Sequence, residues 1–123
     1  MLRVLVVEDD QDTASSSAMV LRLYGHAAEV VPDGPSALQA VLASSPDVVL
    51  LDLALPKMDG WQVAQQIRKL TIAKRPLLIA LSGYGTESDR RRSVEAGIDL
   101  HFVKPVDPAE LEHLLKRFQT IID

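Results

Sequence analysis

The chain has 123 residues, of which 47% are hydrophobic and 24% charged, and its formal net charge is -4. This length suits one domain with a single core, and the apolar content argues against a disordered chain. The acidic balance argues against direct binding of nucleic acid, and the absence of cysteine excludes disulfides, thiolate catalysis and cysteine-based metal sites.

The N-terminal segment does not have the pattern of a secretory signal. Its apolar run, residues 2–7, is too short for the core of a signal peptide and leads into acidic residues instead of a cleavage site. No stretch approaches the roughly 20 apolar residues that span a bilayer. We therefore expect a cytoplasmic protein with no membrane insertion.

Five short apolar runs alternate with longer, more polar segments. The runs predict strands at residues 2–7, 27–31, 48–51, 77–81 and 100–103, several of them almost continuously apolar, as in a buried parallel sheet. The segments between and after them predict helices at residues 13–24, 35–43, 61–70, 88–96 and 108–122. This alternation predicts a single α/β domain with a doubly wound parallel sheet, and five strands fit the flavodoxin-like (βα)5 order 2-1-3-4-5.

Polar side chains follow four of the five predicted strands. The first strand leads into an acidic run that begins at Glu8, the third into Asp52, the fourth into Ser82 and the fifth into Lys104. Ligands of open α/β sheets bind beyond the carboxyl ends of the strands. We therefore expect carboxylates, a hydroxyl and an ammonium group to converge there.

This combination of groups suits phosphoryl transfer. Neighbouring carboxylates repel each other, and a hard divalent cation such as Mg²⁺ relieves the repulsion. Phosphoryl transfer depends mainly on positioning and on neutralising charge, which a metal ion, Lys104 and Ser82 could provide. Asp52 remains as the nucleophile, since carboxylates can form acyl phosphates.

Four motifs stand at the ends of the predicted strands. They are Val7-Glu8-Asp9, Leu51-Asp52-Leu53-Ala54-Leu55-Pro56 with Met58-Asp59-Gly60, Leu81-Ser82-Gly83 and Val103-Lys104-Pro105. With these motifs the chain resembles the receiver domain of bacterial response regulators along its whole length, residues 1–123. The segment Gly83-Tyr84-Gly85 with Asp89-Arg90-Arg91 is similar to the receivers of hybrid histidine kinases.

The resemblance implies a role for each matching position. Asp52 would be the phosphoacceptor, assisted by Ser82 and Lys104. Ser82 would also act as a switch, together with His101, which stands where the family usually has tyrosine or phenylalanine. Histidine at this position could add sensitivity to pH.

The resemblance also implies a metal site and a supporting frame. Mg²⁺, or Mn²⁺ in its place, would be bound by Asp9, by Asp52 and by the backbone carbonyl of Ala54, with Glu8 acting through water. The structural residues near the site would be Pro56, Gly60 and Pro105, and the peptide bond before Pro105 is commonly cis in the family.

Partners follow from the same resemblance. A histidine kinase or histidine phosphotransfer protein would donate the phosphoryl group. A downstream protein or a second copy of the chain would bind the face formed by residues 88–96, 100–103 and 108–122. The domain would catalyse only its own phosphorylation and slow dephosphorylation, so we do not expect an enzyme. The alternatives are a phosphorylation-independent binding module and a Mg²⁺-dependent phosphatase or phosphotransferase.

Several neighbouring residues have simpler explanations. We expect Asp10 to cap the first helix and not to bind metal, and Asp59 to shape its loop or cap the third helix. Trp61 is expected to pack, and His26, beside Gly25 in a turn, to be exposed. The arginines at 90–92 form either a solvated helix face or a partner surface.

Overall fold

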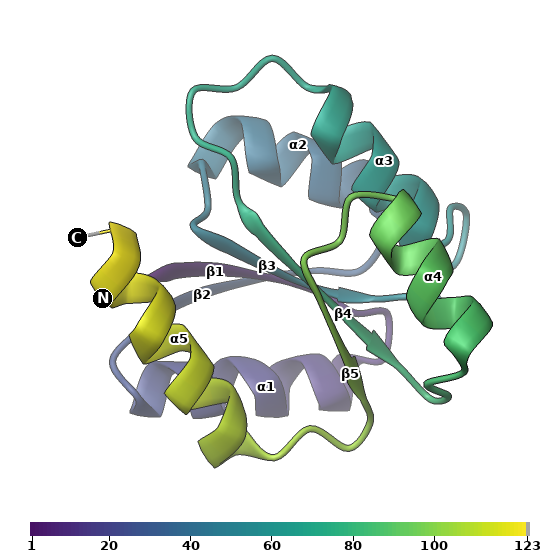
Figure 1. The fold of residues 1–123 in the computed structure, drawn as a ribbon. Helices are drawn as coiled ribbons and strands as arrows, with labels where there is room; N and C mark the ends of the chain where they lie inside the picture. The colour runs from purple at the N-terminus through teal and green to yellow at the C-terminus, as the bar shows by residue number, and fades with distance from the viewer. Residues whose placement is uncertain (123) are drawn as a thin grey trace.

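The computed structural model describes residues 1–122, and within them strands and helices alternate along the chain (Figure 1). The strands are β1 (Arg3–Val7), β2 (Ala27–Val31), β3 (Val48–Asp52), β4 (Leu77–Ser82) and β5 (Leu100–Val103). The helices are α1 (Gln11–Leu23), α2 (Gly34–Ser44), α3 (Gly60–Lys69), α4 (Glu87–Glu95) and α5 (Pro108–Ile122). Every predicted element is present, so the alternating pattern of the sequence is confirmed.

The five strands form one parallel sheet in the order β2-β1-β3-β4-β5, which confirms the flavodoxin-like arrangement. In the central strand β3 all five residues are buried, which explains its uninterrupted run of valine and leucine before Asp52. β1 pairs with β3 so that Val7 lies beside Leu51, and the two strands end next to each other. The residues that follow them are thereby placed at one edge of the sheet.

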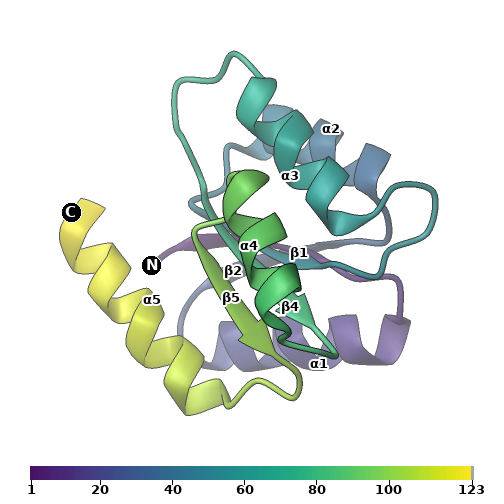
Figure 2. The same cartoon turned by 45° about the vertical axis from the view of Figure 1, so that its right-hand side comes forward.

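Helices cover both faces of the sheet. The two views together show α1 and α5 on one face and α2, α3 and α4 on the other (Figures 1 and 2). On the first face, Leu21 of α1 and Leu115 of α5 pack in a cluster of buried hydrophobic side chains. On the second face, Val41 of α2 and Ile67 of α3 pack in another such cluster. This double burial leaves the carboxyl edge of the sheet as the place where polar groups gather.

Acidic side chains cap the helices that begin near this edge. Asp10 is the N-cap of α1 and accepts a hydrogen bond from the Thr13 amide at 3.1 Å. Asp59 forms a capping box with Gln62 at the start of α3, with bonds of 2.9 and 3.1 Å. Both capping expectations are confirmed.

His26 is buried, so the expectation that it would be exposed is wrong. Its residue is only 6% exposed, and its Nε2 lies 2.9 Å from Oε2 of Glu112, which is 5% exposed. Its Nδ1 accepts the Leu2 amide at 3.2 Å, so the proton lies on Nε2 and the ring is neutral. The turn that contains Gly25 and His26 packs against α5, a contact distant in the sequence that the residues around the turn do not indicate.

No helix within residues 1–122 is both long and apolar enough to cross a membrane.

Candidate functional site

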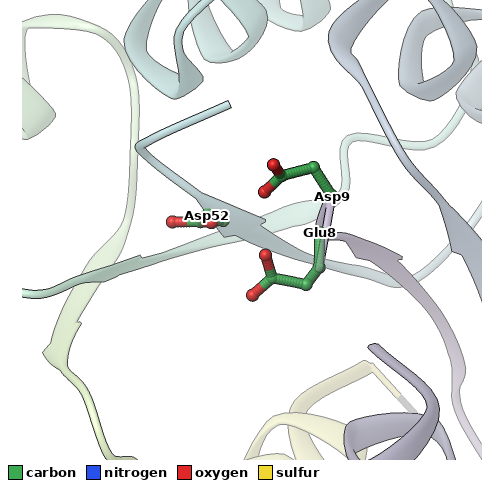
Figure 3. A group of neighbouring side chains, drawn as sticks. All are labelled: Glu8, Asp9 and Asp52. Atoms are coloured by element: carbon green, nitrogen blue, oxygen red, sulfur yellow. The ribbon is translucent and has the colours of Figure 1, made fainter. Parts of the chain in front are cut away.

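Three carboxylates meet where β1 and β3 end. Glu8 and Asp9 follow β1, Asp52 is the last residue of β3, and each offers an oxygen within 4.8 Å of the others. Their side chains point toward the same space (Figure 3). Glu8 and Asp52 are buried at 6% and 5% exposure, whereas Asp9 is exposed. The site is therefore an acidic recess that is open on the side of Asp9.

Lys104 supplies a positive charge to this recess. Its Nζ lies 3.1 Å from Oε1 of Glu8 and 3.4 Å from Oδ1 of Asp52. Burial raises the pKa of Glu8, and the neighbouring Asp52 raises it further. Burial opposes the charge on Lys104, but the hydrogen bond to Glu8 and the charge of Asp52 outweigh it and raise the pKa of the lysine. One ammonium group thus faces three carboxylates, which leaves an excess of negative charge.

The donor set fits a hard divalent cation. All three side chains of the cluster offer carboxylate oxygens, which suit Mg²⁺ or Mn²⁺ better than a metal that prefers thiolate or imidazole. The Ala54 amide donates to Oδ1 of Asp52 at 3.1 Å and so fixes the carboxylate that would face the ion. The three acids expected at the metal site are therefore brought together.

Ser82 and His101 form a second cluster beside the acids. The Ser82 hydroxyl donates to the backbone carbonyl of Tyr84, and its Oγ lies 2.7 Å from Nε2 of His101. Burial lowers the pKa of His101, the nearby Arg90 lowers it further, and Asp89 opposes them. The two expected switch residues are therefore in direct contact, and the ring of His101 favours its neutral form.

The expected structural residues shape the loops around the site. The Gly60 amide donates to the Leu53 carbonyl at 3.0 Å, and a Cβ at Gly60 would lie 2.7 Å from the Asp52 carbonyl oxygen. Only glycine allows α3 to begin so close to the end of β3. Pro56 lies exposed in the intervening loop, and the Lys104–Pro105 peptide is cis, as the resemblance implied.

Two further residues join the His101 cluster without having been anticipated in that role. Ser93 of α4 is 1% exposed, and its Oγ lies 3.0 Å from Nδ1 of His101. The same oxygen accepts the indole N–H of Trp61 at 3.0 Å. Trp61 also packs against the core, so the packing expectation is confirmed. Ser93 is the buried residue of the otherwise very polar helix α4, and the sequence of this helix does not reveal which of its two serines faces inward.

Comparison with known proteins identifies the family. Residues 4–116 match the model of the response regulator receiver domain. The chain is 40% identical over 111 residues to the sensory transduction protein RegX3 of Mycolicibacterium smegmatis. That match covers 90% of this chain and 47% of RegX3, and a match to response regulator MprA of Mycolicibacterium vanbaalenii covers 50% of MprA. The chain thus spans about half the length of these relatives.

Solved structures agree with this match. A receiver domain from Methylobacillus flagellatus has a TM-score of 0.85 and 31% identity, over 96% of this chain and 98% of that one. The receiver domain of sensor histidine kinase PA1611 from Pseudomonas aeruginosa, with a magnesium ion in its active site cleft, has a TM-score of 0.86 and 30% identity, over 95% and 96%.

The chain belongs to the response regulator receiver domain family. Members of this family are phosphoacceptor switches of two-component systems, generally not enzymes, and bind Mg²⁺ at an acidic pocket.

Proposed function

We propose that the chain is a phosphorylation-controlled switch in which Asp52 accepts a phosphoryl group from a histidine kinase or a histidine phosphotransfer protein. The observation that carries this proposal is the convergence of Asp52 with Glu8, Asp9 and Lys104 at one edge of the sheet. The ammonium group of Lys104, together with a divalent cation held by the acids, would neutralise the charge of a phosphoryl group on Asp52. A structural ion pair alone would not need three carboxylates.

The transfer replaces one bond to phosphorus with another. A carboxylate oxygen of Asp52 forms the new bond, while the bond between phosphorus and the donor's imidazole nitrogen breaks. The donor histidine keeps the electron pair of that bond and takes up a proton. The Ala54 amide, 3.1 Å from Oδ1, holds the Asp52 carboxylate in one orientation for this displacement.

Asp9, Asp52 and the backbone carbonyl of Ala54 would bind Mg²⁺, or Mn²⁺, with Glu8 acting through water. When bound, the ion supplies positive charge to the phosphoryl oxygens. Lys104 lies close enough to Asp52 to pair with a second phosphoryl oxygen after releasing Glu8. With these groups the domain would catalyse its own phosphorylation and slow dephosphorylation.

The signal would travel through Ser82. Phosphorylation replaces the single charge of the Asp52 carboxylate by a phosphoryl group with about -1.5 to -2 units of charge, which attracts the Ser82 hydroxyl away from its present partners. The contact with His101 then changes, and with it the face formed by α4, β5 and α5. A downstream protein or a second copy of the chain would read this face, with the domain acting in the cytoplasm and without direct contact to nucleic acid.

Intact-protein mass measured after incubation with acetyl phosphate, with and without Mg²⁺, tests the proposal. Wild type should gain one phosphoryl group only with Mg²⁺, and Asp52→Asn should gain none. Asp47→Asn is the matched control, because Asp47 precedes the opposite end of the same strand. Wild type that binds Mg²⁺ but forms no adduct would favour the binding module, and steady turnover of a small phosphate ester would favour the phosphatase.

A further inference from the structure

A continuous chain of hydrogen bonds links the surface of α3 to Ser82. The Trp61 indole N–H donates to Oγ of Ser93 at 3.0 Å, and that oxygen lies 3.0 Å from Nδ1 of His101. On the other side of the ring, Nε2 lies 2.7 Å from Oγ of Ser82, which in turn donates to the Tyr84 carbonyl. The chain joins residues of α3, α4, β5 and β4.

The two ends of this chain fix the directions of the bonds next to them. An indole N–H can only donate, and a carbonyl oxygen can only accept, so Ser93 accepts from Trp61 and Ser82 gives its only hydrogen to Tyr84. Ser82 must therefore accept from Nε2 of His101, which carries a proton. In the neutral ring Nδ1 is then an acceptor, and Ser93 donates its hydrogen to it. The geometry thus places a proton on Nε2, and the neutral ring with Nδ1 as an acceptor satisfies every bond of the chain.

The surroundings of the chain support this state. Ser93 is 1% exposed and Ser82 is 8% exposed, so water competes little for either hydroxyl. The charged groups that face His101 are Arg90, whose guanidinium donates to the His101 carbonyl at 3.3 Å, and Asp89. Burial and Arg90 lower the pKa of the ring more than Asp89 raises it, which favours the neutral form.

The outer end of the chain lies at the surface between α3 and α4. The Arg92 guanidinium stacks on the Trp61 ring at 4.0 Å and lies 3.9 Å from the carboxylate of Asp59. Trp61 thus lies between the core and the exposed Arg92. If the hydrogen bond of the Trp61 indole changed, the stacking of Arg92 on its ring at the surface would change as well.

We propose that Trp61 and Ser93 are positioning residues that act through His101 to hold the Ser82 hydroxyl against the Tyr84 carbonyl. This inference rests on the proposed function, in which Ser82 must move toward a phosphoryl group on Asp52. When Ser82 leaves, Nε2 of His101 loses its acceptor, so the ring reorients and releases Ser93 and then Trp61. The chain therefore opposes activation and carries the change to the Trp61–Arg92 pair.

The first arm of the test needs no phosphorylation. ¹⁵N NMR of the His101 ring should show a single neutral tautomer, protonated on Nε2, in wild type. Ser93→Ala removes the donor to Nδ1 and should shift the ¹⁵N resonance of Nδ1, whereas Ser88→Ala, at an exposed serine of the same helix, should change nothing. A ring protonated on Nδ1 in wild type, or an unchanged ring in Ser93→Ala, would overturn the chain.

The second arm measures the rate of phosphorylation by acetyl phosphate. Trp61→Phe removes one hydrogen bond that must otherwise break, and Ser93→Ala removes two. Both variants should therefore be phosphorylated at least roughly fivefold faster than wild type and Ser88→Ala. Equal or slower rates in both variants would overturn the positioning role. Absence of an adduct in every protein would overturn the proposed function together with this role, while the NMR arm would still decide whether the chain exists.

Discussion

Replacing His26 by leucine should destabilise the domain strongly. The imidazole is 6% exposed and bonds two groups that have no access to bulk water at that point, the Leu2 amide and the Glu112 carboxylate. Leucine fills a similar volume but offers neither an acceptor nor a donor. The substitution therefore leaves a buried amide and a buried carboxylate without their partners.

The size of the effect follows from these two losses. A buried polar group left without a partner costs about 1–3 kcal/mol, and more when it is charged. We expect His26→Leu to lower the free energy of unfolding by about 3 kcal/mol in total. At roughly 4 °C per kcal/mol for a domain of this size, the melting temperature should fall by about 12 °C.

Urea unfolding measures this effect directly. His113→Leu is the matched control, since His113 is exposed on the helix that also carries Glu112, and it should be close to neutral. Adding Glu112→Leu to His26→Leu removes the stranded carboxylate and should restore part of the loss. A His26→Leu protein as stable as His113→Leu would show that the buried contacts of His26 contribute little to stability.

Three further predictions concern the site. Mg²⁺ should raise the melting temperature of wild type, with about 2.7 kcal/mol of stabilisation at a hundred times the dissociation constant, and Asp9→Asn should lose most of this effect in the same thermal scan. Gly60→Ala should cost about 1–3 kcal/mol in urea unfolding, because its Cβ would lie 2.7 Å from backbone atoms. The pKa of His101 is lower in the folded than in the unfolded chain, so as the pH drops the unfolded chain takes up a proton at this residue before the folded chain does. The free energy of unfolding should therefore fall as the pH drops below 6.5, the ordinary pKa of the group. Unfolding of His101→Phe across the same pH range should lack this contribution.

Each of these predictions has a contrary result. Equal stabilisation of wild type and Asp9→Asn by Mg²⁺ would argue against a metal site at this edge. Gly83→Ala is the control for Gly60→Ala, since nothing lies within 4 Å of a Cβ at Gly83, and equal losses in the two variants would contradict the packing argument. Parallel pH profiles for wild type and His101→Phe would contradict the neutral ring.

The fold followed from short-range patterns. The strands are buried on both faces, so their apolar runs, such as the one that ends at Asp52, are continuous and easy to recognise. Helix boundaries were less certain because capping depends on side-chain geometry. The first helix begins at Gln11, two residues earlier than predicted, once Asp10 serves as its N-cap.

The acidic cluster was predictable for a related reason. Parallel strands deliver their carboxyl ends to one edge, so Glu8 and Asp52 had to lie close together once the strand order was known. The contacts of His26 with Glu112 and of Ser93 with His101 were not predictable in this way. Each depends on how a helix packs over the sheet, and neither leaves a periodic signal in the chain.

In the proposed switch Asp52 itself carries the phosphoryl group. Reduction of the acyl phosphate with borohydride after treatment with acetyl phosphate and Mg²⁺ converts the modified aspartate to homoserine, which peptide mass spectrometry can locate. We expect homoserine at position 52 alone, and none without Mg²⁺. Homoserine at Asp9 or at another acid, with position 52 unmodified, would contradict it.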